Sequence, residues 1–411
     1  MNEFFQLLPP QVAYARWWEQ VTHRVAPELV DALAALDRVT EQAITSPEAL
    51  PAFPRSTVDG YAVRAADTFG ASDSLPAYLR VTGEVLMGQA ASIPVEAGCA
   101  MLIHTGGMLP PGADAVVMVE HTQHFAADEI EVLRPVAPGE NVLQMGEDVT
   151  EGADVIPAGH RLQPQDVGAL LALGLARDLP VMRRPVVNIF STGDELVPPD
   201  TAALQPGQIR DINGSSIAAL CLRAGADPRL NPIIRDEPDA LYDALAGVFK
   251  TSDMLVITAG SSVSVRDMTA EAINRLGVPG VLVHGVAARP GKPAILAVVD
   301  GKPVIGLPGN PVSALVMFTL FGVPAIAGLM NAPLPRRDWR TVRVAANVPS
   351  TAGREDYVPV RLEDRAGDLW AVPVFGKSNL IFTLVGAAGL LRVPLDKTGL
   401  REGDTGEVVL F

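Results

Sequence analysis

The sequence predicts a multidomain protein built around a three-layer α/β domain with a mostly parallel sheet. The chain has 411 residues, which is more than one domain of roughly 100 to 200 residues holds. From residue 184 onward, continuous apolar runs alternate with segments of helical periodicity. Apolar runs without alternation are typical of parallel strands buried on both faces. Their alternation with helices predicts helices on both sides of that sheet.

The α/β domain is expected to span residues 181–329, and its elements are located in order along the chain. The first buried strand is the run VVNIF at 186–190. Later strands are expected at RLNPIIR, DMLVIT, AILAVV and PVIGL, with helices near 214–225, 239–251 and 269–276.

The N-terminal segment is expected to be helical and to belong to a discontinuous helical and linker domain, residues 1–45 and 139–180. A second helical pattern over residues 163–175 supports this assignment. Within residues 11–44, apolar side chains recur at spacings of three and four, namely Val25, Leu29, Ala32, Leu33 and Leu36.

Two further regions are expected to be rich in β-strands. Residues 46–138 show short alternating runs such as YLRVTGEVL and DAVVMVEHT between Gly and Pro residues, which predicts a β-rich module inserted into the N-terminal domain. Residues 330–411 open with the linker NAPLPRRDW. They then predict a small β domain with strands at TVRVAANV, YVPVRL, LWAVPV and GEVVLF.

Composition limits the partners and the compartment. Asp plus Glu exceed Lys plus Arg by 47 to 32, a formal net charge of −15. This sign disfavours binding to nucleic acid or to an anionic membrane surface. The two cysteines are too few for a disulfide framework, and neither a signal peptide nor a membrane span is indicated. We therefore expect a cytoplasmic protein, with Trp17 and Trp18 in the core or at a dimer interface.

Four Gly-rich polar loops flank the predicted strands of the α/β domain. Turn chemistry explains any one of them, but ligands bind outside the carboxyl ends of parallel strands, so four such loops favour a binding site. Small residues let backbone N–H groups approach a phosphate, although neither a Walker nor a Rossmann motif is present. The expected substrate-binding residues are Ser191, Thr192, Gly193, Asp194, Gly260, Ser261, Ser262, Arg289, Pro290, Gly291, Lys292, Pro308, Gly309, Asn310 and Ser313.

Carboxylates are also concentrated at this predicted edge of the sheet. Two or three of them facing bound phosphates would suit Mg²⁺, which prefers a few carboxylates together with water and phosphate oxygens. Solvation or helix capping explains any single one equally well. The five are Asp194, Glu195, Asp211, Asp236 and Asp267.

Two loops of the β-rich module carry polar groups as well. Asp59 lies in STVDGYAV before an apolar run, where a simple Asp-Gly turn is the alternative. Thr105 lies in the small-residue loop HTGG, whose hydroxyl and N–H groups could hold an oxyanion or merely form a turn.

Read in order, the motifs resemble those of the molybdopterin molybdenumtransferases, a family that includes the E domain of gephyrin. The resemblance runs from near residue 30 to the C-terminus. Its motifs are STVDGYAV, TGGMLPPGADAVV followed by Glu120, GEDV, STGDELV, GQIRDIN, IIRDEPDAL, RPGKP, GLPGNPVSA and GREDYVPV.

The resemblance implies a homodimer in which the α/β domain of one subunit faces the β-rich insertion of the other. It also implies that adenylylated molybdopterin and molybdate bind, that the pyrophosphate link is cleaved with Mg²⁺, and that molybdenum cofactor and AMP are released. Contact with other molybdenum cofactor biosynthesis proteins is implied too. By position, the implied catalytic residues are Asp59, Thr105, Glu195, Asp236 and Asp267, with Glu195 and Asp267 as ligands of Mg²⁺.

Two departures from the family pattern leave alternatives open. The loop GSSVSVRD matches the family's acidic residue only with a one-residue gap at Asp267, and His284 and Arg289 stand where many members have lysine. A related pterin or nucleotide enzyme that adenylylates or cleaves a pyrophosphate is one alternative. A non-catalytic dimeric scaffold of the same fold is another, and the presence of Asp59, Glu195 and Lys292 counts against it.

Overall fold

The computed structural model describes residues 7–260, 263–334 and 338–411, without the side chains of residues 263–266. The chain divides into two compact units. The first unit consists of Met1–Glu41, Gly159–Gln163 and Arg177–Phe411, and the second consists of Gln42–Ala158 and Pro164–Ala176. The division into four domains remains a prediction.

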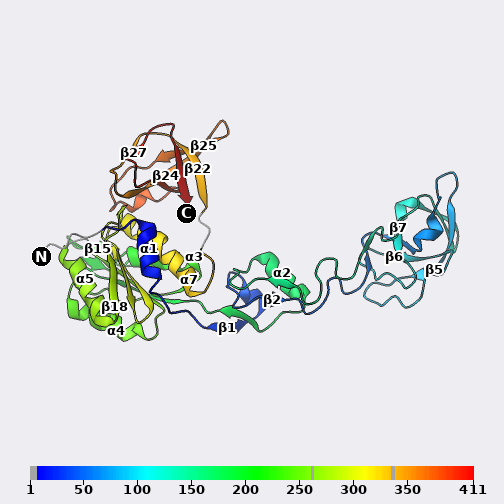
Figure 1. Ribbon diagram of the computed structural model, residues 1–411, viewed down its shortest axis with the longest axis horizontal. Helices are drawn as coiled ribbons and strands as arrows, with labels where there is room; N and C mark the ends of the chain where they lie inside the picture. The colour runs from blue at the N-terminus through cyan, green and yellow to red at the C-terminus, as the bar shows by residue number, and fades with distance from the viewer. Residues whose placement is uncertain (1–6, 261–262, 335–337) are drawn as a thin grey trace. The chain divides into compact units, whose positions relative to one another are not determined.

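The centre of the first unit is a six-stranded sheet (Figure 1). Its first four strands are parallel to one another, as the continuous apolar runs predict, and the last two strands are added by antiparallel pairings. In sheet order the strands are β16 (Asp227–Leu230), β13 (Val186–Ser191), β17 (Met254–Ala259), β21 (Lys302–Pro308), β20 (Ile295–Val299) and β18 (Pro279–His284).

The antiparallel direction of β20 follows from a tight hairpin. Asp300 and Gly301 alone separate β20 from β21, and their φ angles are 47° and 80°. Two consecutive positive φ values are typical of a type I′ turn, for which Asp-Gly is a favoured sequence. The strands AILAVV and PVIGL are therefore confirmed, but as a hairpin rather than as two parallel strands.

Helices cover both faces of the sheet, which confirms the three predicted layers. On β17, Val256 belongs to one hydrophobic cluster and its neighbour Ile257 to the other, so both faces are buried. One face packs against α1 (Pro10–Trp18), α3 (Asn213–Ala224) and the helical segment 311–329, and the other packs against α4 (Pro238–Phe249) and α5 (Val263–Leu276).

The helical segment 311–329 was not anticipated from the sequence. It comprises α6 (Pro311–Met317), a π-helical turn (Phe318–Gly322) and α7 (Val323–Leu329). Pro324 lacks a backbone N–H, and such irregular turns are common where a helix accommodates proline. Among the described residues this is the one helix long and apolar enough to cross a membrane, and 78% of its apolar window is buried within the protein.

The prediction of a helix throughout residues 11–44 is wrong beyond Trp18. Residues Pro27–Val30 form strand β1, which pairs with β12 (Leu179–Met182), and Leu29 and Leu33 are largely exposed. The helical spacing of these leucines does not overcome Pro27, which lacks a donor and disfavours helical backbone in the residue before it.

The predicted core position is confirmed for Trp17. Its side chain is fully buried, and its indole N–H donates a hydrogen bond to the carbonyl oxygen of Ala297 at 2.7 Å. Trp18 packs beside this core, so close to Gly328 that a Cβ there would lie 2.1 Å from the indole ring. Aromatic residues of α1 therefore anchor the N-terminal segment to the α/β sheet.

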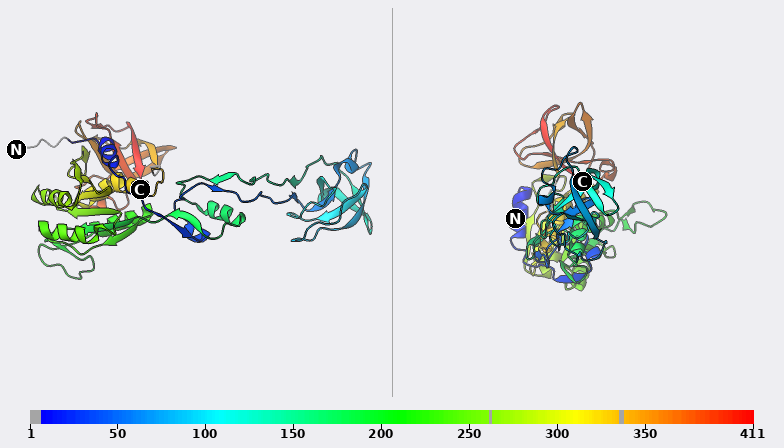
Figure 2. Two further views of the ribbon diagram at one scale, coloured as in Figure 1. Left: turned by 60° about the horizontal axis from the view of Figure 1, so that its bottom comes forward. Right: turned by 90° about the vertical axis from the view of Figure 1, so that its right-hand side faces the viewer.

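The second unit contains the expected β-rich module (Figure 2). Short antiparallel pairs, β2 (Ile44–Thr45) with β11 (Asp154–Ile156) and β3 (Arg55–Ser56) with β10 (Val142–Leu143), join the segments that enter and leave it. The helix predicted over 163–175 is confirmed as α2 (Pro164–Ala172). The sheet contains β7 (Ala115–Met118), β4 (Gly60–Val63), β6 (Cys99–Ile103), β5 (Ala77–Glu84), β9 (Glu129–Val132) and β8 (Thr122–Ala126).

The C-terminal strands close into a small β-barrel. Pairing of β24 with β26 joins the two ends of the five-stranded sheet, so no strand of the ring is left as an edge. A sixth short strand, β19 (Ala288–Arg289), comes from the α/β domain and pairs in parallel with β24. The ring strands are β22 (Trp339–Val344), β24 (Glu355–Arg365), β25 (Asp368–Pro373), β26 (Gly389–Val393) and β28 (Thr405–Leu410).

A buried ion-pair network ties the start of β17 to the N-terminal segment. Burial alone would raise the pKa of Asp253, but hydrogen bonds from His23, Arg183 and the Val186 N–H outweigh it and hold that pKa well below its usual range. A carboxyl whose folded pKa is depressed stabilises the fold at pH values above its unfolded pKa. That contribution disappears as the pH falls through the folded pKa.

We predict that Asp253→Asn destabilises the protein at neutral pH by about 1.5 kcal/mol, because Arg183, which is partly exposed, loses a charged hydrogen-bond partner. The melting temperature of the variant should also fall less steeply than that of the wild type below about pH 4, the unfolded pKa of Asp. Differential scanning between neutral and acidic pH measures both effects. Asp200→Asn, at an exposed position, is the matched control, and equal acid sensitivity of all three proteins would contradict the prediction.

Candidate functional site

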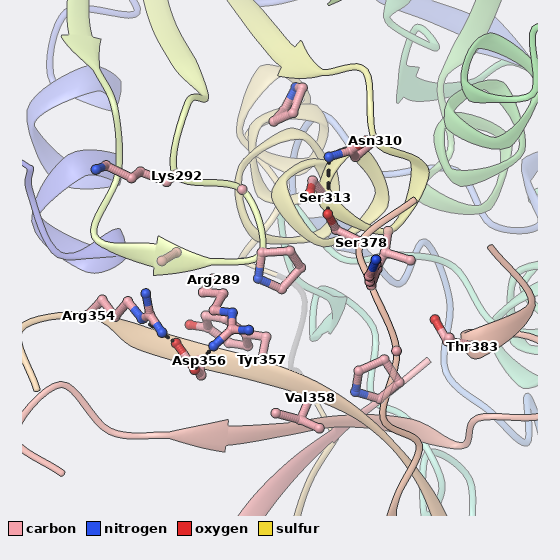
Figure 3. A pocket seen from close by; sticks show the side chains of 18 of the residues that line it. Arg289, Lys292, Asn310, Ser313, Arg354, Asp356, Tyr357, Val358, Ser378 and Thr383 are labelled. Carbon is pink, nitrogen blue, oxygen red and sulfur yellow. Dashed lines mark hydrogen bonds and ion pairs between the residues drawn. The ribbon is translucent and has the colours of Figure 1, made fainter. Parts of the chain in front are cut away.

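A cleft of about 780 Å³ lies between the loops of the α/β domain and the C-terminal barrel, within the first unit (Figure 3). The β19–β24 ladder holds the loop after Arg289 against the barrel. A second loop follows β21 and leads from Pro308 into α6. The predicted residues that line the cleft are Arg289, Pro290, Gly291, Lys292, Pro308, Asn310 and Ser313.

Close packing fixes the course of the first loop. Gly291 has a φ of 114°, and a Cβ at this position would lie 2.4 Å from the Met317 side chain. A side chain here is excluded both by the backbone conformation and by helix α6. Gly291 thus lets the loop between Arg289 and Lys292 lie directly on the helical layer.

Cations dominate the polar lining of the cleft. Arg289, Lys292, Arg354 and Lys377 line it, and Asp356 is the only carboxylate among the described lining residues. Asp356 is buried and lies between two arginines, with Arg354 Nε at 2.9 Å and Arg289 Nη1 at 3.7 Å. Four cations and one acid leave an excess of positive charge, which favours an anionic ligand.

Hydrogen-bonding side chains lie on the other side of the cleft. Asn310 Nδ2 donates to Ser378 Oγ at 3.1 Å, and Ser313 is buried in the first turn of α6. Lys292 extends away from this pair in Figure 3. The cleft therefore presents guanidinium groups from one side and hydroxyl and amide groups from the other, a set that suits a multiply charged oxyanion.

A second cluster of predicted residues lies where β13 and β17 end. The Thr258 hydroxyl donates to Ser191 Oγ at 3.1 Å, and the Gly193 N–H donates to the Ile234 carbonyl oxygen at 3.1 Å. The second of these bonds brings the segment before Asp236 beside the Ser191–Glu195 loop. The sheet thereby gathers Asp194, Glu195 and Asp236 in one place, as expected from strands that end at the same edge.

Asp236 is the perturbed member of this cluster. Burial raises its pKa, and the charges of Asp194 and Glu195 raise it further, while the nearby Thr192 hydroxyl opposes the rise. Asp236 Oδ1 and Thr192 Oγ1 are buried, and neither meets the geometry of a hydrogen bond with any described group. A buried carboxylate oxygen without a partner suits a ligand or a cation.

The remaining acidic residues of the edge are placed differently. Asp211 accepts a hydrogen bond from the Gly214 N–H at 3.2 Å in the first turn of α3, as the capping interpretation predicts. Asp267 is exposed on α5. Gly260 lies against Gly309 at the neighbouring strand ends. Ser261 and Ser262 lie outside the described residues.

The donor set at this edge is compatible with Mg²⁺ only if substrate supplies further ligands. Within residues 7–260, 263–334 and 338–411, no three Asp, Glu, His or Cys side chains are grouped to hold a metal ion by themselves. Mg²⁺ commonly uses one or two carboxylates and completes its shell with water and phosphate oxygens. Glu195 could supply one such carboxylate, and Asp267 or Asp236 the other.

In the second unit, Asp59 and Thr105 are in direct contact. The Thr105 N–H donates to Asp59 Oδ1 at 2.8 Å, and its hydroxyl donates to the same oxygen at 3.2 Å. These two bonds, the backbone one foremost, lower the pKa of Asp59, and His104 adds to the effect. Asp59 and Thr105 therefore lie next to each other in the structure, and their catalytic role remains a prediction.

Three family models together match most of the chain. They are described as "MoeA N-terminal region (domain I and II)" over residues 8–174, "Probable molybdopterin binding domain" over 188–328 and "MoeA C-terminal region (domain IV)" over 341–411. Molybdopterin molybdenumtransferase 2 of Mycobacterium tuberculosis is 36% identical over 365 residues, which is 88% of this chain and 89% of that protein. The chain belongs to the MoeA family of molybdopterin molybdenumtransferases.

Two further relatives agree with this assignment. The molybdopterin molybdenumtransferase of Bacillus subtilis is 33% identical over 381 residues, which is 92% of this chain and 88% of that protein. The crystal structure of the MoeA protein of Pyrococcus horikoshii OT3 has a TM-score of 0.86 at 31% identity and covers 99% of this chain and all of its own. The multidomain MoeA fold, with mixed sheets and a β-barrel, is thereby confirmed.

Within this MoeA fold, sequence reasoning missed part of the cleft. Arg354, Asp356, Lys377 and Ser378 were not among the predicted site residues, although Arg354 and Asp356 belong to the motif GREDYVPV. The motif was used to recognise the family, but its charged residues could not be assigned to the cleft. Only the pairing of β24 with β19 brings them beside Arg289.

We predict that Arg354→Ala weakens binding of a tetrahedral dianion at least about tenfold. A hydrogen bond to a charged group contributes about 1.5 to 3 kcal/mol, and tenfold in affinity corresponds to about 1.4 kcal/mol. Calorimetric titration with sulfate measures the change. Arg365→Ala, at the partly exposed arginine that ends β24, is the control. Equal affinity of both variants would rule out the cationic cleft as the anion site.

Proposed function

We propose that the protein is a molybdopterin molybdenumtransferase, which inserts molybdate into adenylylated molybdopterin and releases molybdenum cofactor and AMP. The observation that carries this proposal is the cationic cleft, in a chain whose net charge is −15 and most of which matches the family models. The name of the relatives, molybdopterin molybdenumtransferase, indicates the class of substrate. The positive charges of the cleft are suited to the anions of that class.

Molybdate is proposed to bind between Arg289, Arg354 and Ser378. As a tetrahedral dianion it can accept hydrogen bonds from a guanidinium on one side and from a hydroxyl on the other. Asn310 already holds the Ser378 hydroxyl in place, and Asp356 holds both guanidinium groups. Tungstate has the same shape and charge, so we expect it to bind to the same groups.

The pyrophosphate link of adenylylated molybdopterin is proposed to lie over the Ser191–Glu195 loop. Gly193 has no side chain, so the backbone of this loop can approach a phosphate closely. The buried residues Ser191 and Thr192 add small polar side chains. Three acidic side chains near a pyrophosphate would repel it unless a cation is shared between them. Mg²⁺ would relieve this repulsion between the acidic side chains and the pyrophosphate.

Glu195 and Asp267 are the proposed protein ligands of Mg²⁺, and Asp236 stands next to Glu195 with an unpartnered oxygen. Mg²⁺, when bound, would neutralise phosphate charge and favour departure of AMP. The protein's own residues hold the pyrophosphate at the sheet edge. The cleft meanwhile holds the incoming oxyanion.

We further propose that the protein acts as a homodimer in which Asp59 and Thr105 of one copy complete the site of the other. The support is the family resemblance and the position of these residues in a module separate from the carboxylates of the α/β domain. The two hydrogen bonds from Thr105 hold Oδ1 of this exposed carboxylate and lower its pKa.

Incubation of the purified protein with adenylylated molybdopterin, Mg²⁺ and molybdate tests the function directly. AMP release that depends on molybdate is the expected result. AMP release without molybdate would favour a simple pyrophosphate-cleaving enzyme, and consumption of ATP with free molybdopterin would favour an adenylylating one. No reaction with any of these substrates would favour a scaffold.

We predict that Asp59→Ala and Glu195→Ala each abolish AMP release without lowering the melting temperature, because both side chains are exposed. Mixing the two inactive variants should restore about a quarter of the wild-type activity. If subunits exchange freely, half of the dimers are mixed, and each mixed dimer keeps one intact composite site of two. Light scattering checks the dimer, and no recovery on mixing would contradict a site shared between copies.

We also predict that Asp267→Asn lowers turnover at limiting Mg²⁺ with little effect on substrate binding. Asp267 is exposed and would act through Mg²⁺ rather than through direct contact with substrate. Single-turnover AMP release across a Mg²⁺ titration measures this, with Asp200→Asn as the control. Full activity of the variant at limiting Mg²⁺ would remove Asp267 from the proposed ligand set.

A further inference from the structure

A chain of three polar side chains crosses one end of the inserted module. His104 Nε2 lies 3.0 Å from Glu84 Oε1, and His104 Nδ1 lies 3.7 Å from Asp59 Oδ1. The three residues come from separate elements: Glu84 ends β5, His104 follows β6, and Asp59 lies in the turn before β4. The sheet therefore brings them together from distant parts of the sequence.

The Asp59 carboxylate depends on these contacts for its orientation. Its side chain is 63% exposed, so packing does not restrict rotation about the bond that carries the carboxylate. The Thr105 N–H, the Thr105 hydroxyl and His104 all approach Oδ1. Among the described residues, Oδ2 receives no hydrogen bond, so this oxygen remains available to a ligand.

Glu84 restricts the imidazole in turn. The His104 side chain is 44% exposed, and its contact with Glu84 holds one ring nitrogen while the other faces Asp59. In its protonated form the ring donates from both nitrogens, one toward each carboxylate. Within the described part of the chain, these two carboxylates are the charged groups that reach ion-pairing distance of His104 from the neighbouring elements.

We propose that His104, oriented by Glu84, is a positioning residue that fixes the Asp59 carboxylate for cleavage of the substrate's pyrophosphate. This proposal rests on the proposed function and adds to it two residues to which the family resemblance gave no role. Thr105 and His104 are adjacent in the chain, so one loop supplies the groups that approach Asp59 Oδ1.

The test compares three variants in the AMP-release assay. His104→Ala should lower kcat about tenfold with little change in KM, less than the roughly hundredfold that a misplacement of about 1 Å can cost. His104→Gln, which keeps a donor at this position, should recover most of the loss. His124→Ala, an exposed histidine on β8 of the same module, is the matched control and should behave as the wild type.

A pH profile separates positioning from a merely structural effect. The Thr105 N–H and then its hydroxyl contribute most to the lowered pKa of Asp59, burial opposes them, and the nearby His104 lowers this pKa further. Loss of His104 should therefore move the acid limb of the kcat profile to higher pH. Carbon-13 NMR titration of the Asp59 carboxyl should show a shift in the same direction without any turnover.

Glu84 is tested by a double-mutant cycle. Glu84→Ala should reduce kcat less than His104→Ala, and the double variant should lose no more than His104→Ala alone, because Glu84 acts through the imidazole. A kcat of His104→Ala within about twofold of the wild type would overturn this proposal alone, whatever the NMR titration shows. A wild type that releases no AMP would overturn the proposed function and this proposal with it.

Discussion

The short parallel ladder between β19 and β24 is the contact on which the cleft depends. It joins Ala288 and Arg289 of the α/β domain to Glu355 and Asp356 of the barrel, and the Glu355 N–H also donates to the Ala287 carbonyl oxygen at 2.9 Å. Backbone hydrogen bonds are directional, so this ladder sets the separation of the two walls more narrowly than apolar packing could. The proximity of Arg289 to Arg354 is a consequence of that pairing.

Asp356 adds ion pairs to this backbone pairing. A buried carboxylate is costly unless it is paired, and Asp356 is paired with Arg354 of the C-terminal segment and with Arg289 of the α/β domain. The same acid also reduces the repulsion that two neighbouring arginines would otherwise exert. The local excess of cations therefore exists within a strongly acidic protein, because geometry rather than net charge determines the field inside a cleft.

The sequence predicted correctly those elements that a pattern of neighbouring residues determines. Continuous apolar runs such as 186–190 identified the buried strands, and the rule that ligands bind at strand carboxyl ends identified the Ser191–Glu195 loop. Periodicity failed over residues 19–44, where Pro27 and pairing with β12 prevail over the spacing of leucines. Arg354, Lys377 and Ser378 could not be found because their membership of the cleft is set by the distant β19–β24 ladder.

The carboxylates show how environment separates residues that look alike in the sequence. Asp356 is buried beside guanidinium groups, whereas Asp236 is half-buried beside other acids and keeps one buried oxygen without a partner. Asp59 is exposed and owes its orientation to hydrogen bonds on a single oxygen. Asp356 therefore suits a structural role, and Asp236 suits contact with a cation or a phosphate. Asp59 suits contact with a ligand that is bound outside its own module. Different environments give carboxyl groups different pKa values and different exposure. Chemically identical acids can therefore serve different roles in one reaction.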